Sequence, residues 1–242
     1  MLLAVDVGNT RIKAAVFEEN TLVEVVVFDL KMVENEIDFI LKKHPKINTI
    51  AVASVGKLDP AAWISFEDRA KLFLITPQTK FPFENRYATP NSLGIDRMVL
   101  AAGAVLQFPR QNRLVIDAGT CITYDFIDEK DEYWGGAISP GIRLRYEALH
   151  QFTAKLPLLT RQAPENYIGN STSESIHSGV VNGVIHEIEG FIAEYQAQYA
   201  KFIIILTGGD AEFLANRLKN TIFAHSNFLL ESLNQTFQYN QK

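Results

Sequence analysis

One order of apolar runs occurs twice along the chain, and this repetition limits the possible folds more than any other feature. In the first copy, continuous apolar runs predict strands at 2–5, 11–17, 21–28, 47–55 and 72–75. Amphipathic spacing predicts one helix that places Val33, Ile37, Ile40 and Leu41 on one face, a helical segment after Pro60 and a helix at 95–107. The first three strands are separated only by short turns, so we expect them to pair antiparallel.

From residue 113 the same order restarts. We expect strands at 113–117, 122–127, 133–138 and 202–206, with helices at 141–152, 172–199 and from Ala211. The repeated order predicts an α/β protein made of two homologous halves, residues 1–109 and 110–242. Helices on both faces of each sheet would account for the long apolar strands.

Composition excludes several function classes. The 242 residues carry 28 acidic and 23 basic side chains, and a net charge of −5 argues against sequence-independent nucleic-acid binding. The single cysteine, Cys121, excludes an internal disulfide, fits a reducing cytosol and is expected to be a small buried thiol. No run reaches the ~20 apolar residues of a membrane span, and an acid at position 6 argues against a signal peptide. We expect a cytoplasmic protein with neither a nucleic-acid nor a membrane partner.

A short acidic turn opens each half. Asp6-Val7-Gly8-Asn9-Thr10 follows the first strand, and Asp117-Ala118-Gly119-Thr120 follows the corresponding strand 111 residues later. A glycine with small polar neighbours lets backbone N–H groups approach a phosphate closely. An aspartate at the strand end fits this role if it holds a cation that bridges to the phosphate. One Asp-x-Gly turn is ordinary hairpin chemistry, but two copies in equivalent places favour a nucleotide clamp.

Three further features each have a structural and a functional interpretation. Lys13 is either a solvated strand charge or a partner of the β- and γ-phosphates. Asp96, near a helix start, either stabilises the helix dipole or acts as a general base, with Arg97 positioning an anion. The turn Thr207-Gly208-Gly209-Asp210 either seats a nucleoside or is a tight turn in which Asp210 caps the next helix.

Other patterns predict local structure. Ser171-x-x-Glu174 is a capping box for the 172–199 helix. Three glycines lie close to one stripe of that helix and would allow close packing against another element or a second subunit: Gly179, Gly183 and Gly190. The 135–141 stretch, with three glycines and a proline, predicts a structural bend between strand and helix.

Some common catalytic motifs are absent from the sequence. The five histidines are scattered and no Cys-x-x-Cys occurs, so no metal site built from these residues is predicted. Neither G-x-x-x-x-G-K-[ST] nor G-x-S-x-G is present, which argues against a Walker-type NTPase and an α/β-hydrolase.

The ordered set of motifs resembles one known family, the type III pantothenate kinases of the acetate and sugar kinase/Hsc70/actin superfamily. The resembling stretches are DVGNTRIK (Asp6–Lys13), YATPNSLGIDR (Tyr87–Arg97), DAGTCITYD (Asp117–Asp125), GGAISPG (Gly135–Gly141), ALHQFTAKLP (Ala148–Pro157) and GNSTSESIHSGVVNG (Gly169–Gly183). The resemblance implies two ribonuclease-H-like halves, each a mixed sheet flanked by helices, with an ATP cleft between them.

The resemblance also implies an activity, namely ATP-dependent phosphorylation of pantothenate at the first step toward coenzyme A. By position, the ATP-binding residues would be Asp6, Val7, Gly8, Asn9, Thr10, Arg11, Ile12, Lys13 and Thr120. The pantothenate-binding residues would be Tyr87, Gly94, Ile95, Asp96, Arg97 and, across a homodimer interface, Thr172. Asp96 would be the catalytic proton acceptor. Asp117 would bind a monovalent cation, K⁺ or NH₄⁺, and Asp6 would hold Mg²⁺, in part through water.

Two departures and two alternatives accompany this resemblance. The third glycine turn reads TGGD, and because an aspartate there should repel phosphate we assign it no ATP contact; Asn170 stands where other polar residues would also fit. The last ~20 residues carry no motif and are expected to be a variable end. The alternatives are another small-molecule kinase of the superfamily, acting on a sugar or acetate, and a non-catalytic accessory or regulatory homologue.

Overall fold

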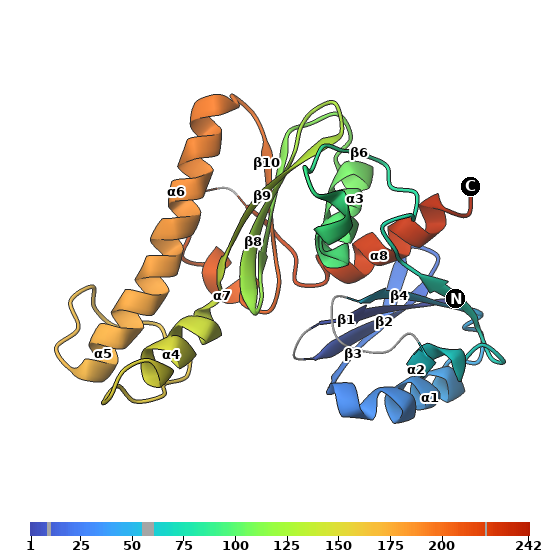
Figure 1. Cartoon of the computed structure of the whole chain (residues 1–242), viewed down its shortest axis with the longest axis horizontal. Helices are drawn as coiled ribbons and strands as arrows, with labels where there is room; N and C mark the ends of the chain where they lie inside the picture. The colour runs from blue at the N-terminus through green and yellow to red at the C-terminus, as the bar shows by residue number, and fades with distance from the viewer. Residues whose placement is uncertain (9–10, 55–60, 221) are drawn as a thin grey trace. The chain divides into compact units, whose positions relative to one another are not determined.

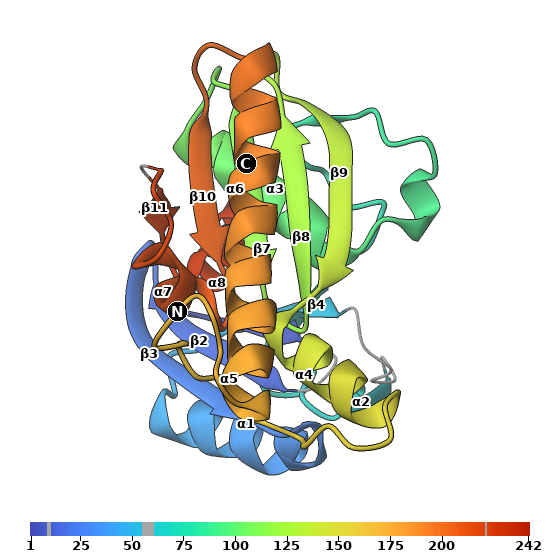
Figure 2. The same cartoon turned by 90° about the vertical axis from the view of Figure 1, so that its left-hand side faces the viewer.

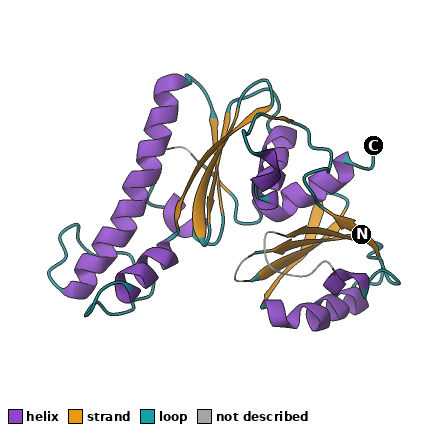
Figure 3. Ribbon diagram, in the orientation of Figure 1, coloured by secondary structure: helices purple, strands orange, loops and turns teal. Residues whose placement is uncertain are grey.

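The computed structural model describes residues 1–8, 11–54, 61–220 and 222–242. The described residues form two sheets flanked by helices (Figure 3). They also form two compact units: the first contains 1–110, 127–134 and 227–242, and the second contains 111–126 and 135–226.

The first unit is built on a five-stranded sheet with the order β3-β2-β1-β4-β5. Its strands are β1 (Leu2–Val7), β2 (Ile12–Glu18), β3 (Thr21–Phe28), β4 (Thr49–Ser54) and β5 (Lys71–Leu74). The expected antiparallel pairing of the first three strands is confirmed, while β4 pairs parallel with β1 and β5 parallel with β4. Every residue of β1 is buried, as expected for a central strand covered on both faces.

Helices cover both faces of this sheet (Figure 1). The helical elements of the unit are η1 (Leu30–Met32), α1 (Val33–Lys43), α2 (Ala61–Ile64), η2 (Pro90–Ser92), α3 (Ile95–Gln107) and α8 (Phe228–Tyr239). On one face, Ile37 of α1 is buried in a cluster with Leu3 of β1. On the other face, Val99 of α3 and Leu233 of α8 are buried with Ala4 of β1. The two layers of helix give this sheet two separate apolar cores.

The second sheet repeats the strand order of the first. Its strands are β6 (Glu84–Asn85), β7 (Arg113–Ala118), β8 (Cys121–Ile127), β9 (Glu132–Pro140), β10 (Ile203–Thr207) and β11 (Phe223–Ala224). The order β9-β8-β7-β10-β11 corresponds to β3-β2-β1-β4-β5, and β6 adds an edge strand beside β9. The repeated topology confirms the duplication that the order of apolar runs predicts.

A long helix covers one face of the second unit's strands (Figure 2). The helical elements of this unit are α4 (Ile142–Gln151), α5 (Thr172–His177), η3 (Ser178–Asn182), α6 (Gly183–Gln198) and α7 (Ala211–Ala215). The predicted 172–199 helix corresponds to α5, η3 and α6, which follow one another directly, and η3 is a π-helical turn. The predicted cap is also confirmed, because the Ser171 side chain accepts a hydrogen bond from the backbone N–H of Glu174 at 3.2 Å.

The end of the chain, for which the sequence predicts no element, forms α8, which buries Leu230 and Leu233 in the first unit's core, so the first unit contains residues from both ends of the chain. Two sequence expectations differ from the structure. The stretch 135–140 is strand, not bend, because β9 continues to Pro140 and only Gly141 precedes the next helix. Cys121 is exposed rather than buried.

Candidate functional site

The first acidic turn joins β1 to β2. Asp6 lies next to the end of β1, is 9% exposed and faces Lys13 across the β1–β2 pair. The Gly8 N–H donates to the carbonyl of Arg11 at 3.2 Å, which closes the turn. Asp6 and Lys13 therefore lie opposite each other on paired strands beside a glycine turn.

Two other residues of this motif have buried side chains. Val7 and Ile12 are 0% exposed and belong to the apolar core on the α1 face of the sheet. Any contact that they make with a ligand must therefore come from their backbone groups. Arg11 is exposed, and the predicted ATP contacts Asn9 and Thr10 lie outside the described residues.

The second acidic turn joins β7 to β8, and Gly141, the residue before α4, packs against it. The Gly119 N–H donates to the Cys121 carbonyl at 2.9 Å, and the Gly141 N–H donates to the Thr120 carbonyl at 3.0 Å. A Cβ at position 141 would lie 2.2 Å from the Gly119 carbonyl oxygen and 2.5 Å from that of Thr120. Only glycine lets the chain before α4 approach this turn so closely.

The TGGD turn packs directly on the second acidic turn. β10 is parallel to β7 with Thr207 opposite Asp117, so both turns leave the same carboxyl edge of the sheet, which is where α/β sheets commonly bind ligands. The Asp210 N–H donates to the Ala118 carbonyl at 2.9 Å. Gly208 has φ +95°, and a Cβ there would lie 2.4 Å from both Asp117 Oδ1 and the Ala118 carbonyl oxygen. These two glycine turns form one continuous surface.

The Asp210 side chain does not cap α7. It occupies the N-cap position but makes no capping hydrogen bond, and instead accepts a hydrogen bond from Nη1 of Arg161. Burial raises the pKa of the Asp210 carboxyl above its ordinary value, and Arg161 offsets part of that rise. The capping interpretation of this residue is therefore wrong.

The Tyr87–Arg97 segment gathers its polar side chains at the start of α3. Gly94 is the N-cap residue, and Asp96 lies in the first turn, where its Oδ1 accepts the Arg97 N–H at 2.8 Å. The Arg97 side chain is mostly buried, at 6% exposure, and its guanidinium carbon lies 5.7 Å from the centre of the Tyr87 ring. The side chain of Ile95 instead packs on the core between α3, α8 and the sheet. The structure thus brings Tyr87, Asp96 and Arg97 together.

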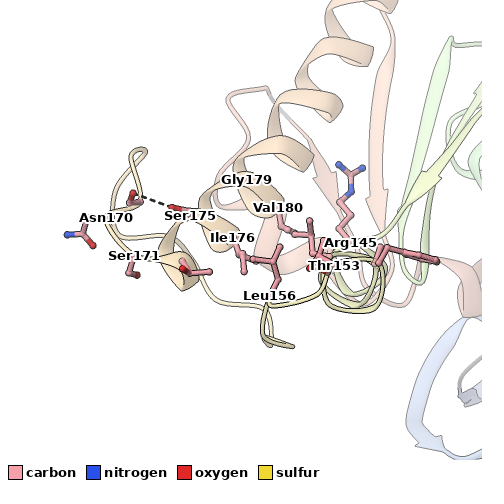
Figure 4. A pocket seen from close by; sticks show the side chains of 14 residues that line it. Arg145, Thr153, Leu156, Asn170, Ser171, Ser175, Ile176, Gly179 and Val180 are labelled. Atoms are coloured by element: carbon pink, nitrogen blue, oxygen red, sulfur yellow. Dashed lines mark hydrogen bonds between the residues drawn. The ribbon is translucent and has the colours of Figure 1, made fainter.

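Thr172 lines a large hollow in the second unit. The cavity has a volume of about 1150 Å³, and its walls come from α4, the segment after it, α5 and η3 (Figure 4). Apolar side chains such as Leu156, Ile176 and Val180 form much of the lining, and Thr172 and Ser171 stand at an exposed stretch of it. The hollow is apolar with a hydroxyl-bearing rim.

A polar cluster around Glu187 was not predicted from the sequence. The Glu187 carboxylate on α6 accepts hydrogen bonds from Tyr124 on β8 at 2.8 Å and from Ser139 on β9, and it pairs with Arg145 on α4. Burial alone would raise the pKa of Glu187, but these three donors together hold it below its ordinary value. Arg145 also donates to the Pro140 carbonyl at 2.9 Å. The cluster fixes the chain on either side of Gly141, and no local pattern in the sequence marks it.

Two kinds of feature are absent from the described residues. Within residues 1–8, 11–54, 61–220 and 222–242, no three His, Cys, Asp or Glu side chains come together as a metal site. Over the same described ranges, no helix has both the length and the apolar character needed to cross a bilayer.

Comparisons with known proteins agree with the motifs. A family model described as type III pantothenate kinase matches residues 2–194. A type III pantothenate kinase of Flavobacterium johnsoniae is 64% identical over 239 residues, covering 99% of this chain and 98% of that protein. One from Bacteroides fragilis is 37% identical over 251 residues, covering 99% and 98%.

Solved structures resemble the chain at lower identity. A protein described as a conserved putative Baf family transcriptional activator from Campylobacter jejuni has a TM-score of 0.65 at 21% identity, covering 99% of this chain and 98% of that one. An inorganic polyphosphate/ATP-glucomannokinase from Arthrobacter has a TM-score of 0.52 at 13% identity, covering 98% of each chain. These likenesses concern the fold, which is the duplicated ribonuclease-H-like architecture. On the family model and the full-length relatives, the chain belongs to the type III pantothenate kinase family.

Proposed function

We propose that the chain transfers the γ-phosphoryl group of ATP to pantothenate, giving 4′-phosphopantothenate in the first step of coenzyme A biosynthesis. The observation that carries the proposal is the cluster of Tyr87, Asp96 and Arg97 at the start of α3 in a chain whose relatives match it over their full length. A sugar kinase of the superfamily would share the acidic turns but not this segment. The reaction belongs in the cytoplasm, where ATP is present and Cys121 stays reduced.

The two acidic turns would hold the nucleotide. Backbone N–H groups of the first turn, together with Lys13, bind phosphate oxygens, and the Thr120 hydroxyl adds a further contact. Asp6 and Asp117 are carboxylates at strand ends beside glycine turns, and hard cations prefer such oxygen ligands. Asp6 would hold Mg²⁺ and Asp117 a monovalent cation, K⁺ or NH₄⁺. When bound, these ions neutralise charge on the phosphate chain.

Asp96 and Arg97 would serve the acceptor. The Asp96 carboxylate takes the proton from the primary hydroxyl of pantothenate, whose oxygen bonds to the γ-phosphorus while the bond to the leaving ADP oxygen breaks. Arg97 binds the substrate carboxylate, and its position over the Tyr87 ring limits the orientations that it can adopt. Because phosphoryl transfer depends mainly on positioning and charge stabilisation, a rigid base at the helix start suits it.

A coupled kinase assay tests the reaction. Purified protein with ATP, Mg²⁺ and K⁺ should consume ATP with pantothenate and not with a panel of sugars or acetate. Asp96→Asn should lower turnover by at least ~10²-fold, the low end for loss of a general base, while ADP binding persists. Near-normal turnover of this variant would remove Asp96 from the role. Replacing K⁺ by Na⁺ tests the monovalent cation, since activity should fall.

The long helix of the second unit supports a homodimer. A Cβ at Gly179, Gly183 or Gly190 would meet nothing within 4 Å, so nothing in the described part of the chain packs closely on this stripe. Large apolar side chains nearby are exposed, among them Phe152 and Ile168. A second copy would cover this surface and bring its Thr172 to the pantothenate site. Light scattering after gel filtration should give twice the 27.2 kDa of one chain, and a monomeric mass for the active protein would contradict the pairing.

A further inference from the structure

The segment between α4 and α5, residues 152–171, is tied to the TGGD turn by one arginine. Arg161 donates from Nη1 to Asp210 Oδ1, and its guanidinium carbon lies 4.6 Å from the centre of the Phe213 ring on α7. The ion pair joins residues 49 positions apart in the sequence. Two independent contacts, one ionic and one with an aromatic face, therefore hold this side chain in place.

The place where Arg161 is held adjoins the proposed phosphate site. Gly208 of the same turn packs on Asp117 and Ala118, and the Asp210 N–H donates to the Ala118 carbonyl. A nucleotide with its phosphates on the turn that begins at Asp117 must therefore come close to the TGGD turn and to whatever side chain lies over it. All of these residues belong to the second unit.

Arg161 supplies the positive charge that would attract the phosphates of a nucleotide to the TGGD turn. Asp117 and Asp210 place two carboxylates in adjoining turns, and both would repel a phosphate chain. Arg161 neutralises Asp210 and remains 40% exposed. A guanidinium has five N–H donors, so bonding to one carboxylate leaves donors for a second anion. The aspartate that departs from the expected glycine turn thus has a role, which is to position an arginine.

We propose that Arg161 is a nucleotide-binding residue, positioned by Asp210 and Phe213, that donates hydrogen bonds to the phosphate chain of ATP. The proposal rests on the kinase function given above. It assigns a ligand contact to the segment between α4 and α5. Loss of this contact should weaken the binding of the nucleotide and leave the binding of the phosphate acceptor unchanged.

The chain offers a matched control. Arg217 stacks on the same Phe213 ring, with its guanidinium carbon 3.9 Å from the ring centre, but its Nη1 donates to the backbone carbonyl of Phe213, four residues earlier in the chain. Arg161→Ala and Arg217→Ala therefore remove the same charge and the same kind of ring contact. Only Arg161→Ala removes a group bound to the TGGD turn.

The experiment measures Mg-ADP binding by calorimetry and the KM values for ATP and pantothenate. Arg161→Ala should raise the ADP Kd and the ATP KM about tenfold, as for loss of one charge-assisted hydrogen bond, with the pantothenate KM within twofold. Arg161→Lys should recover part of the loss, and Arg217→Ala should stay within twofold of the parent. The double variant Arg161→Ala/Asp210→Ala should remain as weak as Arg161→Ala.

Three results would overturn the proposal. Unchanged nucleotide affinity in Arg161→Ala would remove the contact, and equal losses in the two arginine variants would mean a general charge effect. Full recovery in the double variant would mean that Arg161 only neutralises Asp210. If the parent protein binds ADP but transfers no phosphate to pantothenate, the kinase function fails instead, and the ADP titrations still decide the role of Arg161.

Discussion

Replacement of Gly141 by alanine tests the close packing of Gly141 against the second acidic turn. Gly141 has φ −68° and ψ 171°, values that alanine adopts without strain. The substitution therefore acts only through the space that its Cβ needs. That atom would lie 2.2 Å from the Gly119 carbonyl oxygen and 2.5 Å from the Thr120 carbonyl oxygen, where ordinary contact begins near 3.4 Å. The turn and the start of α4 must separate by about 1 Å.

The size of the effect follows from that displacement. Overpacking of this kind costs about 1–3 kcal/mol of unfolding free energy. Neither side can yield easily, because both contacted atoms are backbone and Arg145 holds the approach to α4 through the Pro140 carbonyl and Glu187. A misplacement of about 1 Å in a positioning group can lower the rate by about 10²-fold. We expect Gly141→Ala to reduce kcat/KM for ATP by about that factor.

Urea unfolding and steady-state kinetics on the same preparations measure both quantities. Asn35→Ala is the control, because Asn35 is exposed on α1 of the first unit and an exposed substitution of this kind should leave the stability within about 0.5 kcal/mol and kcat/KM for ATP near the parent value. If Gly141→Ala keeps the parent stability and the parent kcat/KM for ATP, the close approach has no functional weight and the reasoning fails. A loss of stability with an unchanged kcat/KM for ATP would mean that Gly141 stabilises the fold but does not affect the nucleotide site.

Two further predictions concern stability. Glu187→Gln should destabilise the protein by about 1.5–3 kcal/mol at neutral pH through loss of its charged hydrogen bonds. Because the folded pKa of Glu187 is lowered, its contribution is present above the unfolded value of 4.5 and is lost as pH falls through the folded pKa. Urea unfolding should give a smaller difference in unfolding free energy between the parent protein and Glu187→Gln at about pH 3.5 than at pH 7. A larger difference at the lower pH would contradict the assignment. Leu233→Ala should lower the free energy of unfolding by about 2–5 kcal/mol in the same assay, because Leu233 is fully buried in the core under α8. A change near zero would mean that packing of α8 contributes nothing to stability.

The repeated fold could be predicted because its signals are local. The central strands are covered on both faces and so appear as unbroken apolar runs, and the turns between them carry glycine and aspartate. No element is predicted from the sequence at the end of the chain, although Leu230, Leu233 and Phe237 of α8 follow a helical spacing; that spacing does not show that the helix packs on the first unit, and part of its buried face is polar. Ser232 and Thr236 are fully buried, and their hydroxyls donate to carbonyls of their own helix, at 2.6 Å and 2.7 Å. Ser232 also lies where Gly103 of α3 has no side chain, so the close approach of these two helices depends on small residues that no local pattern marks.

The glycines of β9 are typical of a turn in the sequence, although Gly136 instead admits a neighbouring strand. The glycines before Pro140 suggested a bend, yet Gly136 lies within β9, and a Cβ there would lie 1.5 Å from the Tyr124 carbonyl oxygen of β8. A glycine required for close approach and a glycine required for a turn are the same letter in the sequence. Only the neighbour across the sheet distinguishes them.

The residues of the candidate site also differ in whether a local sequence pattern could predict them. Tyr87, Asp96 and Arg97 lie within eleven residues of one another, so a single motif could predict that they act together. The contacts of Arg161 with Asp210, and of Arg145 with Glu187, join residues more than 40 positions apart, and each involves one charged residue among many of its kind. Arg161 and Arg217 are equivalent in sequence terms, and both stack on Phe213. What separates them is the carboxylate that one of them reaches, and only the fold shows which arginine that is.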